Sequence, residues 1–376
     1  MPAVAVEEVP IWKEPVRGFY LDPGTFGALS GLDLLRRFTD GLQLSPPVGY
    51  LYGLLVAGVE PGAATFTMPA SPWLAPPHGV VTGATLALLV DGPLGCAVQT
   101  RLPAATPYTT SELSLSFIRP VLPDGGTLTG KARLVHAGRT VLISDGTVTD
   151  AGGQLVALCS TRCVTLPAVQ LPEEMVRQAL AVPLQQVEPD WPSPHPYERE
   201  VQGVVQPQSV FDTLSGLEVM RGCVTGELGR PPISHLLGLR PTAVEEGVSE
   251  WALPATEWLC SPVEGRLYGG AIAYFAGNAC DGAITTTAEP GTAIAPVDLK
   301  VYFLRPVTPD GRDLTARGQV MHRGHRVAIA SAEVFDAAGK LVATAVSSSM
   351  ILPGRPVTIV RPLEPEKPAE PDRAED

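Results

Sequence analysis

One pattern occurs twice in this sequence, and the duplication restricts the fold more than any other feature. Phe117-Ile-Arg-Pro-Val121 recurs as Phe303-Leu-Arg-Pro-Val307, which is 186 positions later (303 − 117). The same offset relates residues 83–157 to residues 269–343 without a gap. Two copies are too few for a solenoid, so we predict a fused pseudo-dimer in which each half takes the place of one subunit.

Composition and periodicity indicate what each copy contains. The length of 376 residues and the hydrophobic content of 45% suit two domains with separate cores. Apolar and polar residues alternate over Glu112–Phe117, as in a half-buried strand. We therefore predict an α+β fold in which each half packs a helix on an antiparallel sheet. The expected divisions are an N-terminal surface arm (1–27), a first domain (28–166), a Pro-rich linker with a short helix (167–206), a second domain (207–353) and a disordered acidic tail (354–376).

A carboxylate lies on an otherwise apolar stretch, Thr82–Asp91, that we expect to form a buried helix. Asp91 occupies a position where the pattern predicts another core residue, and a buried carboxylate needs a partner to offset its desolvation. The alternative is a solvated or capping aspartate before Gly92 and Pro93. The second copy has Gly277 at this position. Because a structural need for the charge would be expected in both copies, the difference favours a functional aspartate.

Several motifs carry a family resemblance. The first copy contains Gly79-Val-Val-Thr-Gly-Ala84, Leu89-Val-Asp91 and Tyr108-Thr-Thr110, followed by the FIRP motif. Together they resemble the PaaI-like family of hotdog-fold acyl-CoA thioesterases. The second copy resembles the same family more weakly, through Gly265-Arg-Leu-Tyr-Gly-Gly270 and FLRP. The resemblance implies two fused hotdog domains.

The resemblance also implies catalytic roles. In the family an acidic helix residue attacks the thioester or activates water, a glycine N–H binds the thioester oxygen, and a strand hydroxyl assists. These roles fall on Asp91, Gly83 and Thr110. Because hotdog sites are shared between subunits, we expect Asp91 to face Gly269, giving one competent site of Asp91, Gly269 and Thr110. Gly83 would then face Gly277 in a degenerate second site.

Departures from the family pattern supply the remaining candidates. Thr82 replaces the family histidine, Tyr268 stands at that position in the second copy, and Pro296 replaces the strand hydroxyl there. The expected substrate contacts are Thr82, Tyr268, His78 and Asn278. Asn278 could supply a polar group to the second site, whereas we expect Asp281 at the surface. Arg119 and Arg305 could meet CoA phosphates, but structural ion pairs are favoured.

The favoured function is hydrolysis of an acyl-CoA to the free acid and coenzyme A. We expect no metal and no cofactor besides the coenzyme A of the substrate, because the six cysteines form no cluster with histidine. The net charge of −12 argues against nucleic acid, and no stretch suits a membrane span. A cytoplasmic protein with reduced cysteines is expected, and a homo-oligomer of the two-domain unit is left as an open alternative. The alternatives are a non-catalytic acyl-CoA-binding or scaffold protein and a hotdog enoyl-CoA hydratase or dehydratase.

Overall fold

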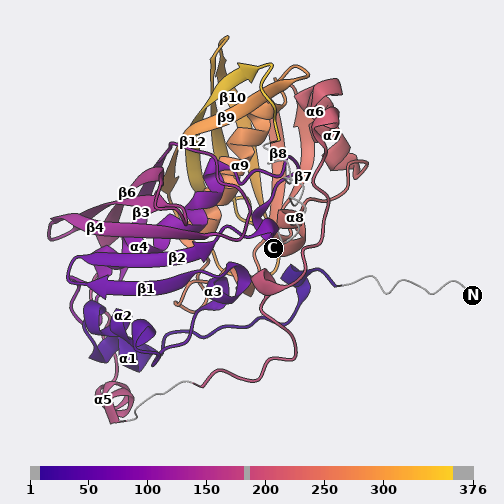
Figure 1. Cartoon of the computed structure of the whole chain (residues 1–376). Coiled ribbons are helices and arrows are strands. Elements are labelled where there is room, and N and C mark those ends of the chain that lie inside the picture. Colours follow the sequence, from indigo (N-terminus) through magenta and orange to yellow (C-terminus); the bar gives the residue numbers. More distant parts are fainter. Residues whose placement is uncertain (1–8, 182–186, 359–376) are drawn as a thin grey trace, which may run out of the picture.

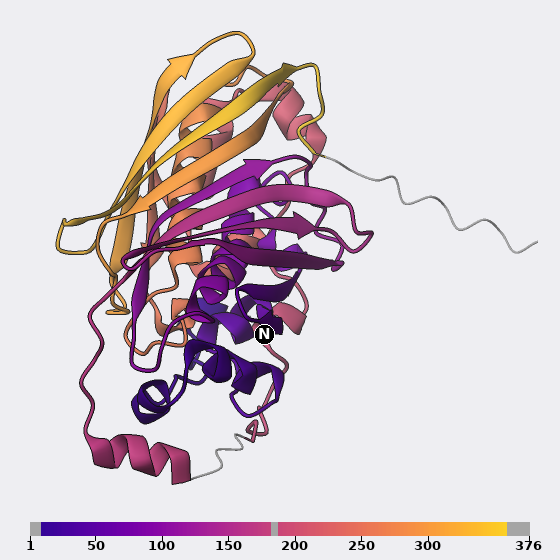
Figure 2. The same cartoon turned by 90° about the vertical axis from the view of Figure 1, so that its left-hand side faces the viewer.

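A single twelve-stranded antiparallel sheet organises the protein. The computed structural model describes residues 9–181 and 187–358. The strand order is β1-β2-β4-β5-β6-β3-β9-β12-β11-β10-β8-β7, so the second half of the sheet repeats the order of the first in reverse. Figures 1 and 2 show the two halves side by side, the first in indigo to magenta and the second in rose to yellow.

The elements of the two halves correspond along the chain. The first half contains η1 (Ile11–Lys13), α1 (Pro23–Ala28), α2 (Gly31–Thr39), α3 (Pro47–Tyr52), β1 (Leu55–Glu60), β2 (Ala63–Pro69), η2 (Pro72–Leu74), η3 (Gly83–Leu86), α4 (Ala87–Gln99), β3 (Tyr108–Phe117), β4 (Thr127–Ala137), β5 (Val141–Thr149) and β6 (Leu155–Thr165). The intervening segment contains α5 (Glu173–Ala181) and η4 (Pro196–Glu198). The second half contains α6 (Gln208–Thr213), α7 (Gly216–Thr225), α8 (Pro232–Leu237), β7 (Arg240–Glu245), β8 (Val248–Pro254), η5 (Glu257–Leu259), α9 (Gly269–Thr285), β9 (Thr292–Phe303), β10 (Asp313–Arg323), β11 (Val327–Phe335) and β12 (Leu341–Pro353).

The two halves join through strands β3 and β9. Ser114 pairs with Lys300, its own counterpart in the duplication (300 − 114 = 186). Leu113 pairs with Val301 and Leu115 with Leu299, so the pairing is symmetric about this point. A pseudo-two-fold axis therefore passes between equivalent residues, as it does between the subunits of a symmetric dimer. The predicted α+β pair of fused hotdog domains is confirmed.

The central helices α4 and α9 lie against the sheet and contact one another. Their side chains are almost entirely buried, since Leu88 and Leu89 on α4 and Phe275 on α9 are fully inaccessible. The helix expected over 82–91 begins as the 3-10 turn η3 and continues as α4 to Gln99, through Pro93. Asp91 therefore lies within a long helix and not at its end.

A serine–glycine motif that occurs in both halves packs against the C-terminal end of each central helix. Ser30 accepts a hydrogen bond from the Asp33 N–H at the start of α2, and Ser215 caps α7 in the same way. The glycine after each serine allows a close approach, because a Cβ on Gly31 would lie 1.9 Å from the Gln99 carbonyl oxygen. Gly216 has the same relation to the carbonyl of Thr285. The motif thus docks a capped helix on the C-terminus of each central helix.

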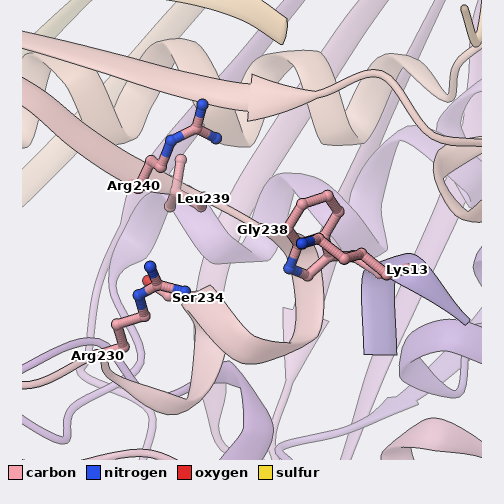
Figure 3. A pocket seen from close by; sticks show the side chains of 7 residues that line it. Lys13, Arg230, Ser234, Gly238, Leu239 and Arg240 are labelled. Atoms are coloured by element: carbon pink, nitrogen blue, oxygen red, sulfur yellow. The ribbon is translucent and has the colours of Figure 1, made fainter. Parts of the chain in front are cut away.

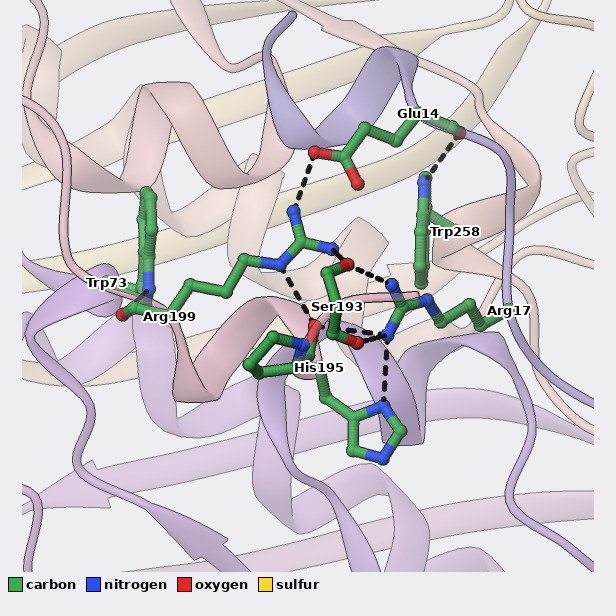
Figure 4. Close-up of polar contacts among 8 residues, drawn as sticks. Glu14, Arg17, Trp73, Ser193, His195, Arg199 and Trp258 are labelled. Carbon is green, nitrogen blue, oxygen red and sulfur yellow. Dashed lines mark hydrogen bonds and ion pairs between the residues drawn. The ribbon is translucent and has the colours of Figure 1, made fainter. Parts of the chain in front are cut away.

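Two segments cross from one half to the other, and they differ from the predicted arm and linker. Glu14 and Arg199 are equivalent residues (199 − 14 = 185), and they form an ion pair with Nη1 and Oε1 2.6 Å apart. The indole of Trp258 donates to the Glu14 carbonyl and that of Trp73 to the Arg199 carbonyl, each over 3.1 Å (Figure 4). Each crossing segment (residues 11–18 and 196–203) therefore packs on a tryptophan of the opposite half.

The expected surface arm is consequently part of the packed structure. Ile11 is 5% exposed and Arg17 is 6% exposed, and Arg17 donates to the carbonyls of Ser193 and Pro194. A proline-rich segment has few N–H donors. It can be buried where these donors and its carbonyl acceptors find partners. The first eight residues and most of the expected disordered tail, 359–376, lie outside the described residues.

Candidate active site

Asp91 lies on α4 where this helix meets the start of α9. Its side chain is 8% exposed. The Gly270 N–H donates to Oδ2 over 2.9 Å, and the Thr110 hydroxyl donates to Oδ1 over 3.3 Å. The first hydrogen bond comes from the other half of the chain, so the carboxylate joins the two halves. The free N–H groups and the dipole at a helix N-terminus favour a negative charge there.

Burial changes the acidity of this carboxyl group. The loss of solvent raises the pKa of Asp91 to about 6, although the hydrogen bonds from Gly270 and Thr110 favour the charged form. Asp91 is therefore mostly ionised at pH 7 but remains a stronger base than an exposed aspartate. Burial likewise raises the pKa of the nearby Cys96 and Cys163 thiols to about 12, so neither is a thiolate at neutral pH.

Gly269, the first residue of α9, lies directly against the carboxylate. A Cβ at this position would lie 2.7 Å from Asp91 Oδ2, so a side chain here would displace the carboxylate. The residue is partly exposed, and among the described residues nothing accepts a hydrogen bond from its N–H. An unpaired N–H beside a carboxylate, at a helix N-terminus, has the geometry of an oxyanion-binding donor.

Two buried tyrosines accompany Asp91. The ring of Tyr268 packs between Gly270 and Gly92, where added Cβ atoms would lie 2.5 Å from Cε1 and 3.2 Å from the hydroxyl oxygen. Tyr268 is 7% exposed and Tyr52 is fully buried, and neither hydroxyl has a hydrogen-bond partner within the described chain. The Gly92 N–H lies near enough to influence the pKa of Tyr268, but without the geometry of a hydrogen bond. Burial and the Asp91 charge raise both tyrosine pKa values well above 10.

The equivalent position in the second half is filled by apolar atoms. A Cβ on Gly277 would lie 2.7 Å from the Cβ of Ala84 and 2.8 Å from Leu299 Cδ2. Ala84 corresponds to Gly270 (270 − 84 = 186), so an alanine stands where the other site has the donor glycine. Pro296 corresponds to Thr110 and has no hydroxyl. This location therefore has neither the acid nor the space for one.

The structure separates the predicted site residues into two groups. Asp91, Thr110, Gly269 and Tyr268 come together at the first location. Gly83 lies against the ring of Phe117 instead, because an added Cβ would be 2.4 Å from Cδ2. The Thr82 hydroxyl lies 3.0 Å from that of Thr85.

His78 and Asn278 do not contact Asp91 in the described structure. His78 Nδ1 accepts from the Val80 N–H over 3.3 Å, and burial lowers the pKa of His78 to about 4. The imidazole is therefore neutral and held within its own turn. The Asn278 amide nitrogen is buried and finds no acceptor among the described residues.

The expectation that Asp281 lies at the surface is wrong. Both of its carboxyl oxygens are buried without a hydrogen-bond partner in the described chain, and burial raises its pKa to about 7. Asp281 corresponds to Gly95 (281 − 95 = 186), which is covered by Tyr108, with the hydroxyl 2.8 Å from an added Cβ. Tyr108 itself is replaced by Ile294 in the second half.

The arginines that follow strands β3 and β9 do not form the ion pairs that the sequence analysis favoured. Arg119 donates to the side-chain oxygen of Gln154, and Arg305 donates to the Leu341 carbonyl. Neither forms an ion pair with a described carboxylate. Two residues that border the site, Gly270 and Tyr52, were not predicted as site residues from the sequence. Gly270 could have been found as the second glycine of the pair that opens α9, whereas Tyr52 carries no local signal.

Comparison with models of known protein families finds a match in each copy of the repeat. Residues 78–157 and 264–343 each match the model of the family described as the thioesterase superfamily. Each copy of the repeat therefore contains a segment that matches this family model, and the two matches lie in tandem. No curated protein is significantly similar to it in sequence.

The solved structures that match cover either most of this chain or about a third of it. A hotdog-fold protein of unknown function from Alicyclobacillus acidocaldarius is 15% identical, with a TM-score of 0.49 over 81% of this chain and 97% of its own. An acyl-CoA thioesterase II from Mycobacterium marinum is 15% identical, with a TM-score of 0.45 over 84% of this chain and 99% of its own. A putative thioesterase from Ralstonia eutropha, described as related to phenylacetic acid degradation, is 29% identical over 35% of this chain and 98% of its own, with a TM-score of 0.32.

Three further structural findings concern the cysteines, possible metal ligands and long apolar helices. All six cysteines are free. Within the described ranges, no three His, Cys, Asp or Glu side chains are grouped so that they could hold a metal ion. No helix of the described chain combines the length and apolar character that crossing a bilayer requires.

Proposed function

We propose that this protein is an acyl-CoA thioesterase of the PaaI-like type with one competent composite site. The observation that carries the proposal is the contact between Asp91 of one half and Gly269 and Gly270 of the other. It places a buried, basic carboxylate beside an unpaired N–H at a helix N-terminus. A thioester carbonyl needs these two groups, one to deliver the nucleophile and one to stabilise the developing oxyanion.

The chemistry follows from the roles of these atoms. The thioester oxygen would accept the Gly269 N–H, which polarises the carbonyl carbon. Asp91 would then remove a proton from an attacking water, or attack the carbon itself and be released by water in a second step. In either route the C–S bond breaks, the acid leaves with the oxygen of water, and the thiolate of coenzyme A takes up a proton. Thr110 would hold the carboxylate in place through its hydrogen bond to Oδ1.

No cofactor beyond the coenzyme A of the substrate is part of this proposal. The second location would not hydrolyse a thioester, because Gly277 provides no carboxylate and Ala84 and Leu299 fill the space. The enzyme would therefore have one active site per chain, and both halves would contribute residues to it.

Release of coenzyme A tests the proposal. Wild-type protein should release it from at least one member of a panel of short, aromatic and long acyl-CoAs, and Asp91→Asn should not. Activity that survives this substitution would contradict the mechanism. Binding of acyl-CoAs without any hydrolysis by the wild type would show a non-catalytic binding protein instead.

A further inference from the structure

A small cavity lies where η1 meets the end of α8 and the start of β7. Its volume is about 140 Å³, and three of the side chains that line it are cationic: Lys13, Arg230 and Arg240 (Figure 3). The Ser234 hydroxyl and the indole of Trp12 also border it. Typical pockets for whole small molecules measure ~300–1,000 Å³. This cavity therefore suits a single compact group.

The charge around the cavity is not neutralised. Lys13 and Arg230 have no carboxylate partner among the described residues, whereas Arg240 pairs with Asp313. Lys13 Nζ lies 4.9 Å from the centre of the Trp12 ring, and this contact holds the ammonium group beside the cavity. Burial and the charge of Arg230 lower the pKa of the neighbouring His235. A net positive cavity is notable in a protein with a net charge of −12.

The other half supplies an internal comparison. At an offset of 185, Lys13 corresponds to Glu198, Arg230 to Ser45 and Arg240 to Leu55. The backbone is alike at both places, because the ring of Trp12 lies against Gly238 as that of Tyr197 lies against Gly53. The fold therefore forms this corner twice, but only one copy is cationic. Packing alone does not explain the three positive charges.

We propose that this cavity binds a phosphate group. Guanidinium groups match phosphate oxygens in pairs, a lysine adds a mobile positive charge, and a serine hydroxyl can donate to a further oxygen. Two sources share this chemistry. One is the nucleotide of coenzyme A, which rests on the function proposed above; the other is a free phosphate ester that acts independently of hydrolysis.

Calorimetric titration tests the site without relying on hydrolysis. Wild-type protein is titrated with adenosine 3′,5′-bisphosphate and with inorganic phosphate, alongside Lys13→Met/Arg230→Met. We expect the variant to bind the bisphosphate at least tenfold more weakly. The matched control is Arg101→Met/Arg139→Met, which removes the same charge from an open surface hollow and should bind as the wild type does. Equal binding by all three proteins, or a loss in the control as well, would overturn the proposal.

Kinetics then separate the two sources. If the nucleotide of coenzyme A is bound here, Lys13→Met/Arg230→Met raises KM for an acyl-CoA about tenfold and leaves KM for the matching S-acyl-pantetheine unchanged. If a free phosphate ester is the ligand, titration shows the loss while both KM values stay constant. A wild type that hydrolyses neither substrate but still binds the bisphosphate at this site contradicts the proposed function and retains the phosphate site.

Discussion

The two halves present nearly the same helix to each other, yet only one meeting point is polar. At the first, Asp91 accepts from the Gly270 N–H across the interface. At the second, the same helix position is Gly277, and Ala84 fills the space beside it. The acid and the donor glycine come from different copies; both are present at the first meeting point and both are absent from the second. A carboxylate can be retained in such a dry interface only where a donor of the partner helix is free to meet it.

The largest expected effect comes from neutralising the carboxylate that only the first location has. Asp91→Asn removes the base and should lower kcat/KM by about 10²–10⁴-fold, as general bases usually contribute. Asp281→Asn is the matched control, because Asp281 is also buried but lies on the second half away from Gly269. We expect its kcat/KM to stay near that of the wild type in steady-state assays of coenzyme A release. A larger loss in Asp281→Asn than in Asp91→Asn would reverse the assignment.

Alanine at the first glycine of α9 or of η3 should affect the reaction rate at one location and only stability at the other. In Gly269→Ala the new Cβ would lie 2.7 Å from Asp91 Oδ2, which displaces the carboxylate. Because small misplacements in an active site lower rates by about 10²-fold, we expect such a loss in kcat/KM. In Gly83→Ala the Cβ would meet the Phe117 ring, so stability should fall while the rate per folded molecule is kept. Thermal melts and assays on both variants check this; a loss of rate in Gly83→Ala alone would contradict it.

The pH dependence of kcat/KM should follow the ionisation of Asp91. Because burial raises the pKa of Asp91 to about 6, the ionised base is lost as the pH falls through 6. The value of kcat/KM should therefore drop about tenfold for each unit below pH 6. The raised pKa also means that the folded state binds the proton more strongly than the unfolded state does, so the Asp91 contribution to stability decreases as the pH rises from about 4 to 6. A profile with no acid limb between pH 5 and 7 would show that another group is the base.

The smallest expected effect concerns the unpartnered hydroxyls. Tyr52→Phe removes a buried hydroxyl that has no partner in the described structure, so the free energy of unfolding should stay equal or rise by up to about 1 kcal/mol. Tyr274→Phe, at a buried tyrosine of the second half, is the control. Chemical denaturation of both variants gives the comparison. Destabilisation by Tyr52→Phe of more than about 1 kcal/mol would mean that its hydroxyl is bonded in the folded protein.

Much of the architecture was open to prediction because its causes are local or repeated. Alternation over Glu112–Phe117 predicted a strand within β3, and the constant offset of 186 predicted two equivalent domains. The family resemblance implied that sites are shared between the two halves, and it therefore predicted that Asp91 faces Gly269. Asp281 could not be placed correctly, because its burial is set by the strands that pack against α9 and not by the pattern along the helix.

Two properties follow from comparing equivalent residues along the chain: it folds as two copies of one unit, and a single copy carries the acid at the helix position. The way in which the copies meet is visible in the three-dimensional structure alone. It includes the pairing of Ser114 with Lys300, the crossing segments held by Glu14 and Arg199, and Gly270 as the donor to Asp91. These contacts join residues that are far apart in the chain, so their geometry is set by packing across the pseudo-two-fold axis, which no local pattern encodes.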